Sequence, residues 1–278
     1  MLSVILCCYY LTPYEMVQCA RRAFKSWGDI DFRIYSTNER HVGASVEGLP
    51  CHFVDNALND FSAYRAACGD AVRADAEGVR PAAYIFLNDT LFLKHPASTV
   101  LKLLRNTLST IAETDAPVLA GKADPYGGLL QTSPFALGLD RYVASFVFGT
   151  NYSGVCLLAD LLHEEKTQKM VESVLSSRDD DIPKKFSSFL KLHLRSGRSE
   201  FAWKNPGLDR ETVRRKAACV LLEHYISARF FVDGFICPLN STTARNVRLL
   251  AAYQARRIIL YRRTARVSQH GGNGKKAS

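Results

Sequence analysis

The chain has 278 residues, of which 47% are hydrophobic and 23% are charged, and its formal net charge is +9. This is the ordinary composition of a folded, soluble globular protein, long enough to bury a full core as one large domain or one and a half. It excludes a chain that is disordered throughout. The net charge comes from one end, because nine basic residues and no acidic residue follow Asp233.

The first residues are predicted to form a strand over residues 2–8. No basic segment precedes this apolar run, and Tyr9, Tyr10 and Pro13 follow too soon for a signal peptide or a membrane-spanning helix. The eight cysteines lie at scattered spacings without a Cys-x-x-Cys pair, mostly inside apolar segments. Reduced cysteine behaves there as a small hydrophobic residue, which favours a cytoplasmic protein and argues against structural zinc.

Strand-like and helix-like segments alternate along the first half of the chain. After the first strand we expect a helix over 13–27, which Gly28 ends. Strands over 31–36 and 51–54 and a helix over 61–76 follow. A strand around Tyr84, a helix over 98–111 capped by Ser98, and a strand beginning at 117–121 follow. This alternation predicts an α/β, Rossmann-like fold with helices on both sides of a mostly parallel sheet.

The second half of the chain is less regular. The patterns predict a strand over 142–148 and helices over 153–175 and 209–231. Between these helices, residues 176–207 are charged and rich in turn-forming residues, so we expect loops there. No internal repeat is visible.

The most informative segment is 84–90, Tyr-Ile-Phe-Leu-Asn-Asp-Thr. Its apolar run predicts a strand buried on both faces, and open α/β sheets bind ligands outside the carboxyl ends of their strands. Asp89 is therefore a candidate to meet a phosphate-bound metal or a sugar hydroxyl. The alternative is that Asn88 and Asp89 only turn the chain, as these residue types do at many strand ends.

The basic end of the chain shows helical periodicity over 242–267, with Val247, Leu250 and Ile258 on one flank and arginines over much of the rest. A basic amphipathic helix suits an anionic membrane surface. The alternatives are a helix packed on the domain and a nucleic-acid-binding tail. No known nucleic-acid-binding motif accompanies the charge. We expect two parts, a domain over 1–240 and a basic helix with a disordered end over 241–278.

Several familiar site types are missing from the sequence. There is no Gly-x-Gly-x-x-Gly after the first strand and no Gly-x-x-x-x-Gly-Lys-Ser/Thr, which argues against a dinucleotide fingerprint and a phosphate loop. The hydrolase and metalloprotease motifs Gly-x-Ser-x-Gly and His-Glu-x-x-His are missing too.

Three segments together, 4–10, 56–65 and 84–90, resemble the amino-terminal half of GT-A-fold glycosyltransferases. The pattern is most similar to the rhamnan-synthesis type of bacterial polysaccharide glycosyltransferase, in which the strand ends in Asn-Asp-Ser rather than Asp-x-Asp. Residues 130–133 and 141–148 resemble that group's later sheet segment. Glu223 to Ser227, followed by Gly234, resembles its late Glu-x-x-x-Ser and glycine turn. The similarity covers roughly residues 1–240.

The resemblance implies roles for particular residues. It implies that the nucleotide of the donor contacts Tyr9 and Tyr10, the 56–65 segment and the end of the 84–90 strand, through the side chains Asn56, Asp60, Arg65 and Asn88. Asp89 would match the second acid of Asp-x-Asp and hold Mg²⁺ or Mn²⁺, while Leu87 stands where the first acid would be. One carboxylate suffices for Mg²⁺ when the diphosphate and water supply the other oxygens.

Transfer also requires positive charge on the leaving diphosphate and, for inversion, a carboxylate that deprotonates the acceptor hydroxyl. Glu223 is the first candidate for this base, with Asp124 and Asp140 behind it, and its alternative role is that of a buried or capping acid. Asp60 is also a candidate N-cap of its helix, a role that does not exclude nucleotide contact.

The resemblance therefore implies a glycosyltransferase, which we expect to be cytoplasmic and peripheral on the inner face of the membrane. It would move a sugar from a nucleotide-sugar to a glycan or lipid-linked acceptor in the synthesis of a cell-surface polysaccharide. A nucleotidyltransferase is the first alternative, against which the missing phosphate loop counts. A non-catalytic binding protein with a membrane-binding or nucleic-acid-binding tail is the second.

Overall fold

The structure is a computed structural model that describes residues 1–78, 80–125, 141–176 and 210–239. The chain divides into two units, Met1–Asn240 and Ser241–Ser278, and the described residues all belong to the first. The predicted basic helix over 242–267 and the segment 130–133 lie outside the described residues. So do the predicted loops over 176–207 except for Ser176, which ends a helix instead.

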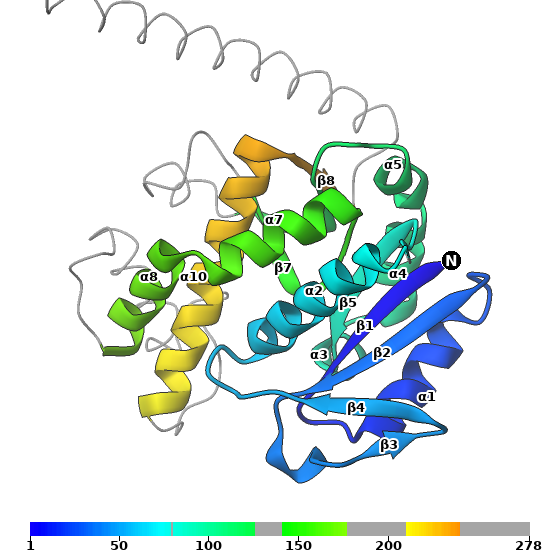
Figure 1. The fold of residues 1–278 in the computed structure, drawn as a ribbon, viewed down its shortest axis with the longest axis horizontal. Coiled ribbons are helices and arrows are strands. Elements are labelled where there is room, and N and C mark those ends of the chain that lie inside the picture. The colour runs from blue at the N-terminus through cyan, green and yellow to red at the C-terminus, as the bar shows by residue number, and fades with distance from the viewer. Residues whose placement is uncertain (79, 126–140, 177–209, 240–278) are drawn as a thin grey trace, which may run out of the picture. The chain divides into compact units, whose positions relative to one another are not determined.

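An eight-stranded sheet with the order β3-β4-β2-β1-β5-β7-β6-β8 forms the centre of the described fold (Figure 1). Its strands are β1 (Leu2–Cys8), β2 (Ile30–Ser36), β3 (Ser45–Val46), β4 (Leu49–Phe53), β5 (Ala83–Asn88), β6 (Val118–Pro125), β7 (Arg141–Thr150) and β8 (Phe235–Pro238). Strands β3 and β7 run against the others, so the sheet is mixed although mostly parallel. The predicted α/β class with a mostly parallel sheet is confirmed.

Helices cover both faces of the sheet. One face carries α2 (Asp60–Ala76), α7 (Tyr152–His163) and α10 (Arg210–Asp233), and α8 (Glu165–Ser176) packs on α7 and α10. The other face carries α1 (Pro13–Phe24), α3 (Thr90–Lys94), α4 (Ala97–Arg105) and α5 (Leu108–Ala112). A short 3₁₀ helix, η1 (Glu39–His41), follows β2.

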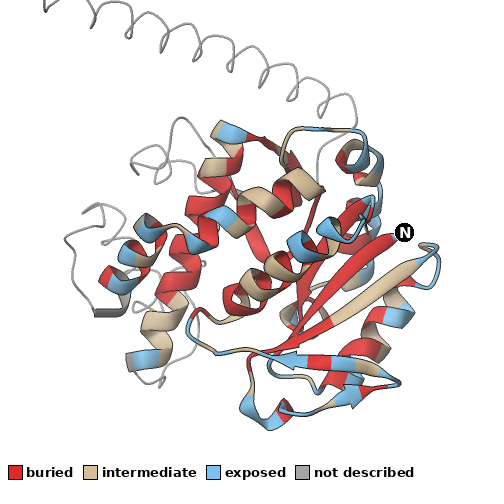
Figure 2. Cartoon of the chain, in the orientation of Figure 1, coloured by how far each residue is buried: buried red, intermediate tan, exposed pale blue. Residues whose placement is uncertain are grey.

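The two central strands are buried along their whole length, as Figure 2 shows in red for β1 and β5. Helices on both faces exclude water from these strands, which explains their continuous apolar sequences. On the α2 face, Phe86 and Phe148 stack with ring centroids 4.9 Å apart, and Tyr64 meets both rings edge-on at 5.4 Å. The Tyr64 hydroxyl donates to the Ser145 carbonyl at 2.7 Å, so its polar atom is satisfied.

The direction in which the chain adds strands changes between β1 and β5. From β1 the chain passes through α1 to β2 and then to β4, on one side of β1. From β4 it returns through α2 to β5, on the other side of β1. This is a topological switch point, and the crevice outside the carboxyl ends of such strands is the usual place of a ligand. The ends that meet there are Cys8 and Asn88.

Two predicted long helices are each two helices in the structure. The 98–111 segment divides into α4 and α5 at Asn106 and Thr107, where the Thr107 hydroxyl donates to the Leu104 carbonyl at 2.7 Å and closes the first helix. Helix α4 begins at Ala97, with Pro96 at the N-cap position and no side-chain cap, so the expected capping by Ser98 is wrong.

The 153–175 segment divides into α7 and α8 because Glu164 has an extended backbone, with ψ of 130°. The Gln168 side chain donates to the Leu162 carbonyl at 2.8 Å and satisfies the end of the first helix. The other predicted elements of the described chain agree within a few residues, whereas the short elements α3, β3 and β8 were not predicted.

Candidate functional site

Asp89 lies at the switch point, immediately after β5, and is only 2% exposed. Its Oδ2 atom accepts hydrogen bonds from three successive backbone N–H groups of the loop after β1: Tyr9 at 2.9 Å, Tyr10 at 2.5 Å and Leu11 at 3.0 Å. Successive N–H groups that converge in this way form an anion-binding concavity. Here the anion is the protein's own carboxylate, which fixes the β1–α1 loop.

This geometry bears on the metal that the sequence predicts at Asp89. An oxygen that already faces three N–H donors has no lone pair left for a cation, so Oδ2 does not fit a metal ligand. Within the described ranges, no group of three or more His, Cys, Asp or Glu side chains is arranged to hold a metal ion. Dependence on Mg²⁺ or Mn²⁺ stays a prediction.

Asp60 and Asn88 lie beside this carboxylate. The Asn88 side-chain amide donates to Asp60 Oδ2 at 2.5 Å, and its oxygen accepts from the Thr90 N–H at 3.1 Å. The Cys7 thiol faces Asp60 Oδ1 at 3.8 Å, which ties the start of α2 to β1. Asp60 is the first residue of α2 rather than its N-cap, which is Asn59 with a φ of +49° and no side-chain cap.

Helix α10 brings Lys216 and Glu223 to the same place. The two residues are seven apart, two helical turns, and therefore share one face of the helix. Glu223 Oε1 accepts a hydrogen bond from the Ser145 N–H of β7 at 2.8 Å. Lys216 lies close enough to Glu223 and Asp60 for both carboxylates to raise the pKa of its ammonium group.

Burial and charge pairing shift the pKa values of the charged groups in this cluster in opposite directions. Burial raises the pKa of Glu223 and of Asp60, and in both the positive charge of Lys216 acts in the opposite direction. Burial alone would lower the pKa of Lys216, but neighbouring Cys219, Glu223 and Asp60 raise it above its ordinary value. Since burial raises the pKa of the Cys219 thiol to about 12, the two carboxylates are what hold the lysine charged at neutral pH.

Tyr9 and Tyr10 form the outer edge of the site. Their rings meet edge-to-face with centroids 4.9 Å apart, and Tyr10 is 63% exposed. The Asn38 amide donates to the Tyr9 carbonyl at 2.8 Å and supports the loop from η1. An exposed aromatic side chain on a fixed loop is a suitable surface for a planar base to stack on.

Two predicted nucleotide contacts form no hydrogen bond or ion pair with this cluster among the described residues. Arg65, on α2, forms an ion pair with Asp55 at 3.4 Å. Asn56 is half-buried in the loop before α2, and its side-chain oxygen has no hydrogen-bond partner. In the described part of the chain, no hydrogen bond or ion pair connects either residue to Asp89, Asp60 or Glu223.

The structure thus brings together Tyr9, Tyr10, Asp60, Asn88, Asp89 and Glu223 and adds Lys216, which sequence reasoning did not select. The available signal was the spacing of seven residues between Lys216 and Glu223 on a predicted helix. Of the other candidate bases, Asp124 lies on β6 opposite Tyr142, and Asp140 lies outside the described residues.

Comparison of the sequence with models of known protein families finds no match, and comparison with curated proteins finds no significant relative. In the part of the chain that the structure describes, every helix is too short or too polar to cross a membrane.

Proposed function

We propose that the chain is a glycosyltransferase that moves a sugar from a nucleotide-sugar donor to a glycan or lipid-linked acceptor, as the resemblance to GT-A enzymes implies. One observation carries the proposal. Asp89 holds Tyr9 and Tyr10 at the switch point of an α/β sheet, where ligands of such folds bind, and α10 brings Glu223 to β7, the neighbour of β5, with Lys216 on the same face of the helix.

The roles follow from the chemistry of the groups. Tyr10, with Tyr9 behind it, supplies a surface for the base, and Lys216 supplies positive charge for the departing diphosphate. Glu223 is the proposed base that takes the proton of the acceptor hydroxyl. Its raised pKa moves it towards neutral pH, where a general base is most effective. Asp89 holds the loop that carries both tyrosines.

Two alternatives have support of their own. A nucleotidyltransferase would use the same crevice and the same lysine. A non-catalytic binding protein is favoured by the hydrogen bonds of Asp89, since they give the strand-end acid a structural role that requires no chemistry.

The first test is nucleotide binding, measured as the shift in melting temperature produced by a panel of nucleoside diphosphates, with and without Mg²⁺ or Mn²⁺. A ligand at 100 times its Kd stabilises the native state by about 2.7 kcal/mol, which is roughly 5–10 °C for a domain of this size. We expect such a shift for at least one nucleotide in the wild-type protein.

The variant Lys216→Met should lose most of the shift, measured against its own unliganded melting temperature, because it lacks the cation that faces the diphosphate. Lys25→Met, at the exposed end of α1, is the matched control and should keep it. If no nucleotide shifts the wild-type protein under either metal condition, the non-catalytic alternative replaces the proposal.

A further inference from the structure

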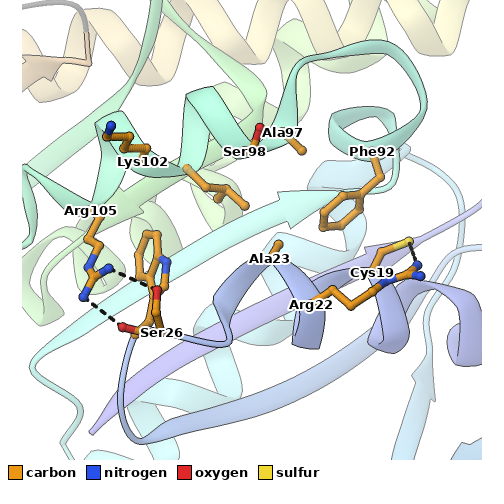
Figure 3. A pocket seen from close by; sticks show the side chains of 11 residues that line it. Cys19, Arg22, Ala23, Ser26, Phe92, Ala97, Ser98, Lys102 and Arg105 are labelled. Atoms are coloured by element: carbon orange, nitrogen blue, oxygen red, sulfur yellow. Dashed lines mark hydrogen bonds between the residues drawn. The ribbon is translucent and has the colours of Figure 1, made fainter.

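A hollow lies on the α1 side of the sheet, between α1 and α4 (Figure 3). Its volume is about 1140 Å³, open mouth included, and it runs from Cys19 and Phe92 at one end to Ser26 and Arg105 at the other. We call it the α1/α4 groove. Its apolar lining includes Ala23, Trp27, Phe92 and Leu101, and its polar rim includes Arg22, Lys102 and Arg105.

The charge of this groove has one sign. Three basic side chains and no acidic residue line it, and the sequences of α3 and α4 contain no acid. Arg105 is oriented by Ser26, to whose hydroxyl and carbonyl it donates at 3.1 and 2.8 Å, and its guanidinium lies 5.9 Å from the centre of the Trp27 ring. Arg22 donates to the Cys19 sulfur at 3.5 Å.

None of the three basic rim residues forms an ion pair with another described residue. The groove therefore presents uncompensated positive charge beside an apolar floor.

We infer that the α1/α4 groove binds an anionic phospholipid, with the headgroup held by the positive rim to which Arg22 and Lys102 belong and the first part of an acyl chain on the apolar floor. The flanking surface is suited to a lipid interface, because Tyr14 on α1 is 58% exposed and Leu93 on α3 is 49% exposed. This inference does not depend on the proposed function.

Two other occupants fit the groove less well. An acidic peptide would match the charge, but both walls are helices whose backbone groups bond within the helix, so an extended peptide finds no main-chain partners there. An acyl chain needs none. A basic peptide would be repelled by the rim, whose charged side chains are all positive.

The experiment uses the full chain carrying Trp203→Phe, which leaves Trp27 as the only tryptophan. Vesicles with brominated acyl chains quench tryptophan fluorescence on contact. Anionic vesicles should quench Trp27 at low salt, and neutral vesicles should not. Quenching of Trp27 reports contact of lipid with the groove itself, and it is a separate measurement from any vesicle binding by residues 241–278.

The double variant Arg22→Gln/Lys102→Gln in the same background should require roughly 25-fold more anionic lipid for half-quenching, about fivefold for each charge removed. Arg73→Gln, an exposed arginine on α2 of the opposite face, is the matched control and should behave as the parent does.

Unquenched Trp27 when the protein cosediments with anionic vesicles would overturn the inference, as would unchanged quenching in the double variant. If a soluble polyglutamate peptide blocks quenching and itself shifts Trp27 emission at lower concentration than dispersed anionic lipid does, the groove is a peptide site and the lipid assignment is wrong.

Discussion

At the scale of single residues, the carboxylate of Asp89 joins two segments that are about 80 residues apart in sequence. A carboxylate was predicted at this strand end on the expectation that it faces a ligand. Instead, one of its oxygens faces the β1–α1 loop, and the groups that the structure offers to a ligand are the tyrosines of that loop and the charged side chains of α10. Asp89 thus supports the site by fixing the position of Tyr9 and Tyr10.

The first prediction follows from these three hydrogen bonds. Asp89→Asn should lower the free energy of unfolding by about 1.5–3 kcal/mol, because hydrogen bonds to a charged acceptor become bonds to a neutral amide. Urea denaturation measures the change. Asp31→Asn, which removes the acid of the Asp31–Arg33 pair on β2, is the control and should change stability by about 1 kcal/mol or less.

An Asp89→Asn variant as stable as the wild-type protein would contradict this structural role. If that variant also lost activity in the presence of metal, the metal prediction would regain its support.

The second prediction concerns pH. Because burial raises the pKa of the Glu223 carboxyl, the folded state binds this proton more tightly than the unfolded state does. The contribution of Glu223 to stability is therefore full below its ordinary pKa of 4.5 and is lost as pH rises through its folded pKa. Glu223→Gln should flatten the fall in stability over this range, measured by urea denaturation at a series of pH values. An unchanged slope in the variant would show that Glu223 is not the group responsible.

At the scale of elements, Gly154 in the first turn of α7 allows the helix to approach the sheet closely. A Cβ there would collide with the Thr150 hydroxyl and would lie 3.0 Å from the Val118 carbonyl. Both atoms are held in place, because the Thr150 hydroxyl donates to that same carbonyl.

Gly154→Ala should therefore destabilise the protein by about 1–3 kcal/mol through overpacking. The matched control is Gly69→Ala in α2, where the added Cβ meets only the end of the Arg73 side chain at 3.6 Å. It should stabilise by about 0.4–1 kcal/mol, since alanine loses less conformational entropy in a helix. Thermal unfolding of both variants checks the prediction. Equal effects of the two changes would contradict the close approach of α7.

The same elements show what the sequence could predict. The bounds of strands β1 and β5 were predicted almost to the residue, because a strand buried on both faces requires an uninterrupted run of apolar residues. The breaks at Asn106–Thr107 and at Glu164 were missed, since no proline or glycine marks them and hydrogen bonds to helix ends decide them. Edge strands β3 and β8 are too short for any periodicity to show.

At the scale of the whole molecule, alternating strands and helices predicted an α/β fold but not the reversal of β7, which depends on long-range pairing with β5 and β6. The candidate site was predicted in part for a similar reason. Polar residues at strand ends can be recognised in the sequence because they directly follow an apolar run. Lys216, by contrast, joins the site only because α10 packs against β7. The prediction that residues 241–278 bind anionic vesicles stays a prediction.

Turnover of a panel of nucleotide sugars, followed as release of free nucleoside diphosphate with and without Mg²⁺ or Mn²⁺, tests the proposed function most directly. The wild-type protein should release the diphosphate from at least one donor, and Glu223→Gln should slow transfer to an acceptor by about 10²–10⁴-fold. Glu211→Gln, an exposed acid in the first turn of the same helix, should leave the rate unchanged. The absence of turnover with every donor and metal, or equal rates for the wild-type protein and Glu223→Gln, would contradict the assignment of this site to sugar transfer.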